Sequence, residues 1–184
     1  SGPSGNWLVE ADFGSETLSD GIEYVNDGET LAIDMHTDSV EGSENLNVVG
    51  VRVTLQYSED ETSSGFGCGI PGASDPDPDT ITGMISNSET NGSSSGQNSD
   101  DGVSSHLIEV EWFNDSLIGN VSGLSKSDII DGLEVGDYGL GPYLLEISVT
   151  SETGGSPGCA HSDNGEEVEY SVELVTLEYT IEPS

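Results

Sequence analysis

The sequence almost lacks positive charge. Its 184 residues include 36 Asp and Glu but only two Lys and Arg, so the formal net charge at pH 7 is −34. Binding to nucleic acid requires clustered basic side chains, and attraction to an anionic membrane requires the same. The composition therefore predicts no nucleic-acid partner and no direct contact with an anionic membrane. Solvent cations are the partners that this surface attracts.

The two basic residues, Arg52 and Lys126, leave nearly all the carboxylates without a cationic partner in the chain. Repulsion between these carboxylates opposes compaction at low salt. At about 1 M salt the screening length falls to about 3 Å, and most of this penalty disappears. The charge balance therefore predicts a protein adapted to high salt or to an environment rich in divalent cations.

Long apolar runs are also missing. No stretch of about 20 apolar residues predicts a transmembrane helix, and the start of the chain does not read as a signal peptide. We expect residues 1–6 to be a tag or linker and residues 7–184 to form a single domain. This domain is expected to be the ectodomain of a secreted or membrane-anchored surface protein.

Catalytic signatures are absent as well. The chain has no Gly-x-Ser-x-Gly elbow, phosphate-binding loop or dinucleotide fingerprint. Its histidines, His36, His106 and His161, share no helix face and no His-x-His pattern. We therefore predict no catalytic residue and no enzymatic activity. A hydrolase remains an alternative, because 36 carboxylates allow many acid–base pairs.

Apolar residues alternate with polar ones through most of the chain, which is typical of strands with one buried face. The slip in this alternation between Leu174 and Leu177 predicts a bulge or bend. The pattern favours an all-β fold, an antiparallel two-sheet β-sandwich of the immunoglobulin (Ig-like) type. The predicted strands cover residues 7–13, 31–35, 46–57, 80–85, 107–113, 143–149 and 168–181.

Two stretches depart from this alternation. Around residues 126–134 the pattern predicts one short helix, because Ser125 and Asp128 form a capping-box pair and Leu124 and Ile129 take the positions of a hydrophobic staple. The Ser-, Gly- and Asn-rich stretch 86–104 is predicted to be a flexible loop.

The two cysteines, Cys68 and Cys159, each lie in a Gly-rich loop and follow a Glu-Thr pair by the same spacing. An even number of cysteines in such loops favours a disulfide and an extracellular or cell-surface location. The alternatives are two free thiols or a metal-binding pair, for which no second Cys or His stands at zinc-like spacing.

Carboxylates at Asp75, Asp77 and Asp79 alternate with two prolines that stiffen the backbone. Since Ca²⁺ takes six to eight oxygen ligands, this run is a candidate calcium site, and calcium is the one cofactor that the sequence suggests. The alternative is a stiff, solvated acidic linker. Asn91, Asn114 and Asn120 begin sequences that match the N-glycosylation pattern.

The acidic composition with almost no Lys resembles that of proteins from halophilic or marine archaea. The β-rich, two-Cys layout with Gly/Ser loops resembles an archaeal cell-surface Ig-like domain, in style over the whole chain and without a family motif. We expect an extracytoplasmic structural or interaction module with a surface-protein or glycan partner. The alternative is a Ca²⁺-stabilised carbohydrate-binding module, in which Trp7 or Trp112 would stack on sugar rather than pack in the core.

Overall fold

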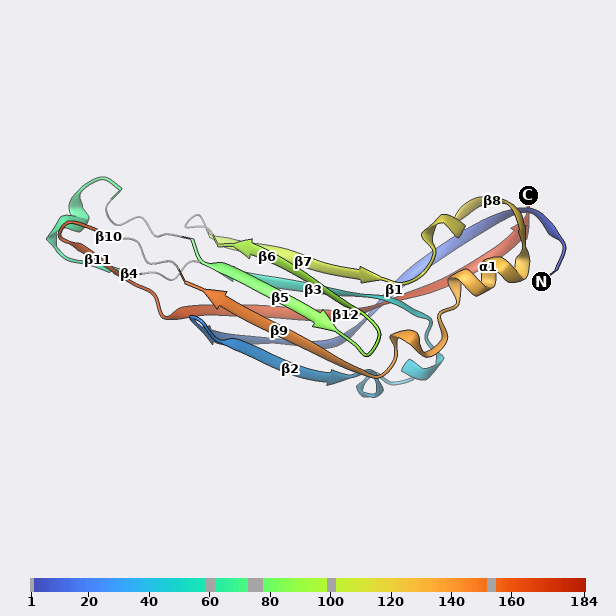
Figure 1. Cartoon of the computed structure of the whole chain (residues 1–184), viewed down its shortest axis with the longest axis horizontal. Coiled ribbons are helices and arrows are strands. Elements are labelled where there is room, and N and C mark those ends of the chain that lie inside the picture. Colours follow the sequence, from blue (N-terminus) through green and yellow to red (C-terminus); the bar gives the residue numbers. More distant parts are fainter. Residues whose placement is uncertain (1, 59–61, 73–77, 99–101, 152–154) are drawn as a thin grey trace.

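The computed structural model of the chain is elongated and is built almost entirely of antiparallel strands (Figure 1). It describes residues 2–58, 62–72, 78–98, 102–151 and 155–184. Within these residues, a five-stranded sheet has the order β7-β3-β12-β1-β8, and a four-stranded sheet has the order β2-β9-β5-β6. These two sheets confirm the predicted all-β antiparallel sandwich. A small third sheet has the order β10-β11-β4.

A strand is present at each predicted range, but β1 continues to Asn26, well beyond the predicted 7–13, and β4, β6, β8, β10 and β11 were not predicted. The five-stranded sheet comprises β1 (Ser4–Asn26), β3 (Val48–Ser58), β7 (Val103–Glu111), β8 (Gly119–Ser125) and β12 (Gly165–Pro183). The four-stranded sheet comprises β2 (Thr30–His36), β5 (Thr80–Ser86), β6 (Asn91–Gln97) and β9 (Pro142–Thr150). The small sheet comprises β4 (Thr62–Ser64), β10 (Gly155–Ser156) and β11 (Cys159–Ser162). The helical elements are α1 (Lys126–Leu133) and the 3-10 turns η1 (Thr37–Ser39), η2 (Ser43–Asn45), η3 (Phe66–Gly69), η4 (Asp115–Leu117) and η5 (Gly136–Gly139).

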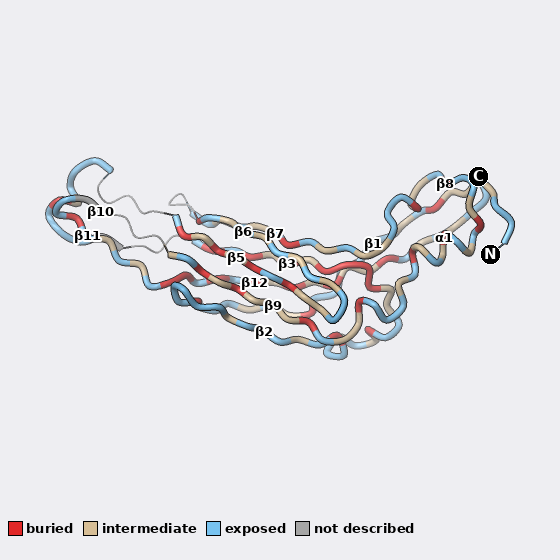
Figure 2. Tube along the Cα trace, in the orientation of Figure 1, coloured by how far each residue is buried: buried red, intermediate tan, exposed pale blue. Residues whose placement is uncertain are grey.

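The main core lies between the two larger sheets. Alternate residues of β3, such as Val53 and Leu55, are fully buried, and so are Leu145 and Ile147 of β9. Figure 2 shows the buried positions concentrated along the strands of the sandwich. A period of two places every second side chain on the inner face, which is why the sequence pattern located these strands.

A second core lies on the opposite face of β12. Leu174 belongs to the main core, whereas Leu177 packs with Val9 of β1 and with Ile129 and Leu133 of α1. The pairing of β12 with β3 shifts register between Val175 and Thr176. The ladder is thus irregular where the sequence predicted it, between Leu174 and Leu177, but the extra residue is Val49 of β3, and β12 itself stays in register with β1. The β1–β12 ladder therefore serves two cores, one on each face.

Helix α1 confirms the predicted short helix and its cap. The Ser125 hydroxyl accepts from the Asp128 backbone N–H at 3.1 Å, and the Asp128 carboxylate accepts from the Ser125 N–H at 3.2 Å. The bonds from Ser125 lower the pKa of Asp128. In the described residues, no helix is long and apolar enough to cross a membrane.

The structure differs from two expectations about irregular segments. Residues 4–6, predicted to be tag or linker, belong to β1, where Ser4 pairs with Ser125. Within the stretch 86–104, predicted to be a flexible loop, residues 91–97 form β6 and pair with β5. A Cβ atom on Gly92 would collide with Val110, and one on Gly96 with Tyr57 and His106. β6 fits against its neighbours because its glycines lack side chains, and not because apolar residues pack there. The alternation of apolar residues therefore did not reveal this strand.

Candidate functional site

The small third sheet lies at one end of the long axis, and both chain termini lie at the other end (Figure 1). We call residues 62–72 and 155–162, which contain β4, η3, β10 and β11, the tip. Ala160 of β11 pairs with Ser64 of β4. The backbone N–H of Gly67 donates to the carbonyl of Gly158 at 2.9 Å. These bonds join two segments that are far apart in the sequence.

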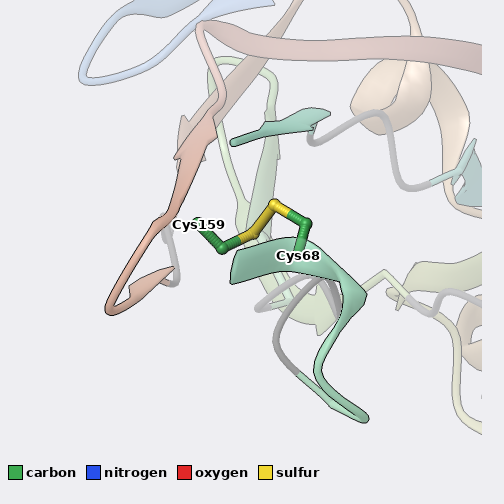
Figure 3. The surroundings of a disulfide bond; sticks show 2 residues. All are labelled: Cys68 and Cys159. Atoms are coloured by element: carbon green, nitrogen blue, oxygen red, sulfur yellow. A yellow bond between two sulfur atoms is a disulfide. The ribbon is translucent and has the colours of Figure 1, made fainter. Parts of the chain in front are cut away.

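The disulfide between Cys68 and Cys159 also joins these segments (Figure 3). Their Cα atoms are 4.7 Å apart, and 91 residues separate them in the sequence. The predicted bond is thus confirmed, and the alternatives of free thiols or a metal-binding pair are wrong. Disulfides of this kind form and persist in oxidising compartments.

The tip exposes two large apolar side chains and contains no carboxylate. Phe66 is 97% exposed and Ile70 is 60% exposed. Neither of the two tip segments contains Asp, Glu, Lys or Arg, although 36 of the 184 residues of the chain are Asp or Glu. The tip therefore contrasts with the acidic body.

A buried polar cluster connects β5, β6 and β12. Asp79, Asn98 and Glu166 are all buried. The Asn98 side chain accepts from the Asp79 backbone N–H at 2.7 Å and donates through Nδ2 to Glu166 Oε2 at 2.7 Å. The Asn98 N–H also donates to the Asp79 carbonyl at 3.1 Å. One amide thus joins three segments that meet only in the folded chain.

Tyr57 of β3, a residue of the main core, forms a hydrogen-bonded pair with His106 of β7. The Tyr57 hydroxyl donates to His106 Nδ1 at 2.7 Å, and His106 Nε2 donates to the Ser94 carbonyl at 3.3 Å. Burial lowers the pKa of His106, which favours its neutral form. Burial and then the Glu166 charge raise the pKa of Tyr57, which keeps the hydroxyl protonated. Both side chains therefore act as neutral hydrogen-bonding groups.

The outer face of the five-stranded sheet has an open hollow of about 240 Å³, which we call the Arg52 hollow. In the strand register Arg52 lies opposite Glu109 of β7 and Glu173 of β12. Its Nε is buried and has no hydrogen-bond partner among the residues that the structure describes. The hollow is lined by Phe13, Val51, Arg52, Glu109, Glu111 and Val175.

The Arg52 hollow combines an aromatic surface with hydrogen-bonding groups of both kinds. Phe13 is 48% exposed, and its ring packs against that of Phe113 with centroids 5.7 Å apart. The guanidinium group is a donor, whereas the carboxylates of Glu109 and Glu111 are acceptors. A net charge of −34 opposes the approach of an anion. These properties suit a neutral ligand that carries several hydroxyl groups.

A second hollow, of about 540 Å³, is strongly acidic and lies between η2, η5 and β12. Its lining includes Glu44, Glu134, Asp137 and Glu178. The Tyr179 hydroxyl donates to Glu134 Oε1 at 2.8 Å, and burial together with this carboxylate raises the pKa of Tyr179. Over the described ranges, no group of three or more His, Cys, Asp or Glu side chains is arranged to hold a metal ion.

The predicted calcium ligands are only partly described. Asp75 and Asp77 lie outside the described residues, and Asp79 is fully buried. The calcium site therefore stays a prediction. Asn91, Asn114 and Asn120 are exposed, so the structure leaves all three accessible to glycosylation, which also stays a prediction.

The indole groups have the packing role that the sequence favoured. Both are half-buried, and each Nε1 donates to a backbone carbonyl: Trp7 to Leu124 at 3.0 Å and Trp112 to Val48 at 2.7 Å. The exposed aromatic side chains of β1 are Phe13 and Tyr24 instead. Sequence reasoning missed Phe13 and Arg52 as site candidates, although one Arg on the polar face of an otherwise acidic chain was the available signal.

No protein-family model and no curated protein matches the sequence. Solved structures show distant similarity. A structure of Broad Bean Stain Virus aligns with 99% of this chain and 90% of its own, at 10% identity and a TM-score of 0.30. The top component of Cowpea mosaic virus aligns with 93% of this chain and 91% of its own, at 10% identity and a TM-score of 0.33. TmCBM61 in complex with β-1,4-galactotriose aligns with 94% of this chain and 87% of its own, at 8% identity and a TM-score of 0.27. At these TM-scores the similarities carry no functional argument.

Proposed function

We propose that this chain is an extracytoplasmic structural or interaction module of a surface protein, adapted to high salt, and not an enzyme. The observation that carries the proposal is the Cys68–Cys159 disulfide, because a cytosolic protein of ordinary redox environment keeps its thiols reduced. The acidic composition supports the salt adaptation, and the resemblance of the β-rich, two-Cys layout to archaeal cell-surface domains supports the location.

Redox state and accessibility in the producing cells test this location. In the first experiment, intact cells are treated with an external protease and an antibody detects the chain that remains. In the second, the denatured protein is treated with a thiol-reactive polymer, with and without prior reduction. We expect the protease to remove the protein and the polymer to shift its mobility only after reduction. A protease-protected pool with two reactive thiols would contradict the proposal. Turnover of an ester, glycoside or peptide substrate would contradict its non-enzymatic part.

A carbohydrate-binding module is the second candidate, and the Arg52 hollow is the observation that favours it. An exposed ring beside donor and acceptor groups matches the stacking faces and hydroxyl groups of a neutral sugar. A glycan array would identify ligands, and titration calorimetry would then compare Arg52→Met and Phe13→Ala with Ile22→Ala. Ile22 is an exposed apolar residue of β1 outside this hollow. If Ile22→Ala alone weakens binding, or if no glycan binds, the hollow is excluded as the sugar site.

Calcium remains part of this second candidate. If Asp75, Asp77 and Asp79 hold Ca²⁺, the ion raises the melting temperature more than an equal ionic strength of NaCl does. The Asp77→Asn variant should then lose the calcium-dependent part of the increase. An unchanged calcium response in Asp77→Asn would place the site elsewhere.

A further inference from the structure

The tip combines the most exposed large apolar side chain of the described residues with a complete lack of formal charge. Phe66 is 97% exposed, and Ile70, four residues later, is 60% exposed. Residues 62–72 and 155–162 contain no Asp, Glu, Lys or Arg. In a chain of net charge −34, these two segments expose large apolar side chains and have no carboxylate of their own, although Glu61 and Asp163 adjoin them in the sequence.

The tip is also preformed. The Cys68–Cys159 bond and the β4–β11 pairing hold its two segments together. At the end of η3 the Ile70 N–H donates to the Gly67 carbonyl at 3.2 Å. A surface that is already ordered loses little conformational entropy when it binds. The exposed side chains are thus carried on a braced loop at the end of the long axis (Figure 1).

We propose that the tip inserts Phe66 and Ile70 into the surface of a lipid bilayer with zwitterionic or neutral headgroups. The inference rests on the proposed extracytoplasmic location, which would bring the tip to an outer membrane surface. A bilayer accepts a projecting apolar side chain without a preformed pocket. A second copy of the chain is a poorer occupant, because two large side chains fall short of the roughly 1,200 Å² that specific interfaces bury.

Charge selects the kind of bilayer. An anionic leaflet has a negative surface potential, which repels the acidic body and acts within about one screening length. A zwitterionic surface carries no such potential, so the uncharged tip can reach it at any salt concentration. This agrees with the sequence-based expectation of no direct contact with an anionic membrane. Binding through two side chains should be reversible and weak, of the order seen for a single acyl anchor.

Vesicle flotation with the whole chain tests the inference. We expect the wild type to float with phosphatidylcholine vesicles at both low and high salt, and with vesicles containing phosphatidylserine only at high salt. Phe66→Ser and Ile70→Ser should each reduce partitioning by about tenfold or more, the factor expected for one large apolar side chain. Ile22→Ser is the matched control, because Ile22 is also 60% exposed but lies on β1.

Fluorescence measures insertion directly. In a Phe66→Trp variant, brominated lipids should quench the added fluorescence, whereas in Ile22→Trp they should not. Thermal melts should match the wild type for all these variants, since the replaced side chains are exposed. Absence of flotation, equal loss in Ile22→Ser, or lack of quenching would overturn the inference. Loss of a protein partner in Phe66→Ser without vesicle binding would assign the tip to a protein pocket instead. None of these results depends on the cell-accessibility experiment. A failure of the bilayer-binding proposal can therefore be distinguished from a failure of the proposed extracytoplasmic location.

Discussion

The Asn98 side chain donates to Glu166, with 2.7 Å between Nδ2 and Oε2, and both residues are buried. The same side chain accepts from the backbone of Asp79, another buried acidic residue. The only Lys and Arg of the chain are Lys126 in α1 and Arg52 in the outer face of β3. An uncharged amide therefore bonds the Glu166 carboxylate here, where less acidic proteins use a salt bridge. A buried polar group must be bonded to be tolerated.

The substitution Asn98→Asp tests this arrangement. It replaces the amide donor with a carboxylate beside Glu166, so we expect the free energy of unfolding at pH 7 to fall by about 3–5 kcal/mol, as when a buried charge is left uncompensated. Burial and the like charge would raise the pKa of the introduced Asp in the folded state. The folded variant would then bind the extra proton first, and its deficit should shrink as the pH falls from 7 towards 4. Urea unfolding from pH 7 to pH 4 measures this deficit in the free energy of unfolding. The exposed Asn45→Asp serves as control, and a pH-independent deficit would contradict the interpretation.

His106 should make stability depend on pH in the opposite direction. Burial lowers its pKa in the folded protein below the ordinary value of 6.5. As the pH falls through 6.5, the unfolded chain therefore takes up this proton before the folded chain does, and the contribution of neutral His106 to stability is lost. We expect the difference in unfolding free energy between wild type and His106→Gln to decrease as the pH falls from 8 to 5. An NMR titration of the ring that gives a pKa of 6.5 or above would refute this.

Asn47 connects the end of α1 to β12. Its Nδ2 donates to the Leu133 carbonyl at 2.9 Å and to the Leu177 carbonyl at 3.3 Å, and its Oδ1 accepts from the Val135 N–H at 3.1 Å. We expect Asn47→Ala to cost about 2–3 kcal/mol, which is about 5–10 °C in melting temperature for a chain of this length. Asn45→Ala removes an exposed amide nearby and should stay within about 0.5 kcal/mol of the wild type. Equal losses in the two variants would show that the Asn47 bonds contribute nothing specific.

Local patterns predicted the parts of the fold that depend on local physics. The alternation in β3, β9 and β12 follows from a strand period of two, and the cap of α1 requires only Ser125 and Asp128. The slip between Leu174 and Leu177 was visible because the buried face of β12 changes there. The pattern could not reveal β6, whose Gly92 and Gly96 fit the strand beside Val110 and Tyr57 by lacking side chains.

The candidate sites were less predictable, because they join residues that only the fold brings together. The two cysteines were an exception, since two matched loops in an even-cysteine chain indicate a bond without a structure. Asn98 and Glu166 are 68 residues apart, and no local signal links them. The Arg52 hollow requires β7, β3, β12 and β1 to be neighbours in that order, which the sequence did not specify.

Repulsion between carboxylates can be tested at one defined pair. In the β1–β12 ladder Asp12 lies directly opposite Glu178, and both are exposed. Like charges at directly opposed positions of a sheet destabilise it by about 0.2–1 kcal/mol. Asp12→Asn should therefore raise the melting temperature at about 0.05 M NaCl, where the screening length exceeds 10 Å.

The salt dependence separates this repulsion from any other effect of the substitution. At about 1 M NaCl the screening length falls to about 3 Å, so the advantage of Asp12→Asn should disappear while the wild type itself becomes more stable. Asp20→Asn is the matched control, because Asp20 is an exposed acid of the same strand that lies opposite uncharged Ser171. It should gain less at low salt. Melts at pH 7 from 0.05 to 2 M NaCl measure all three proteins. A wild-type melting temperature that stays flat or falls with salt would remove the main support for a high-salt habitat, because the 36 carboxylates would then already be neutralised without screening.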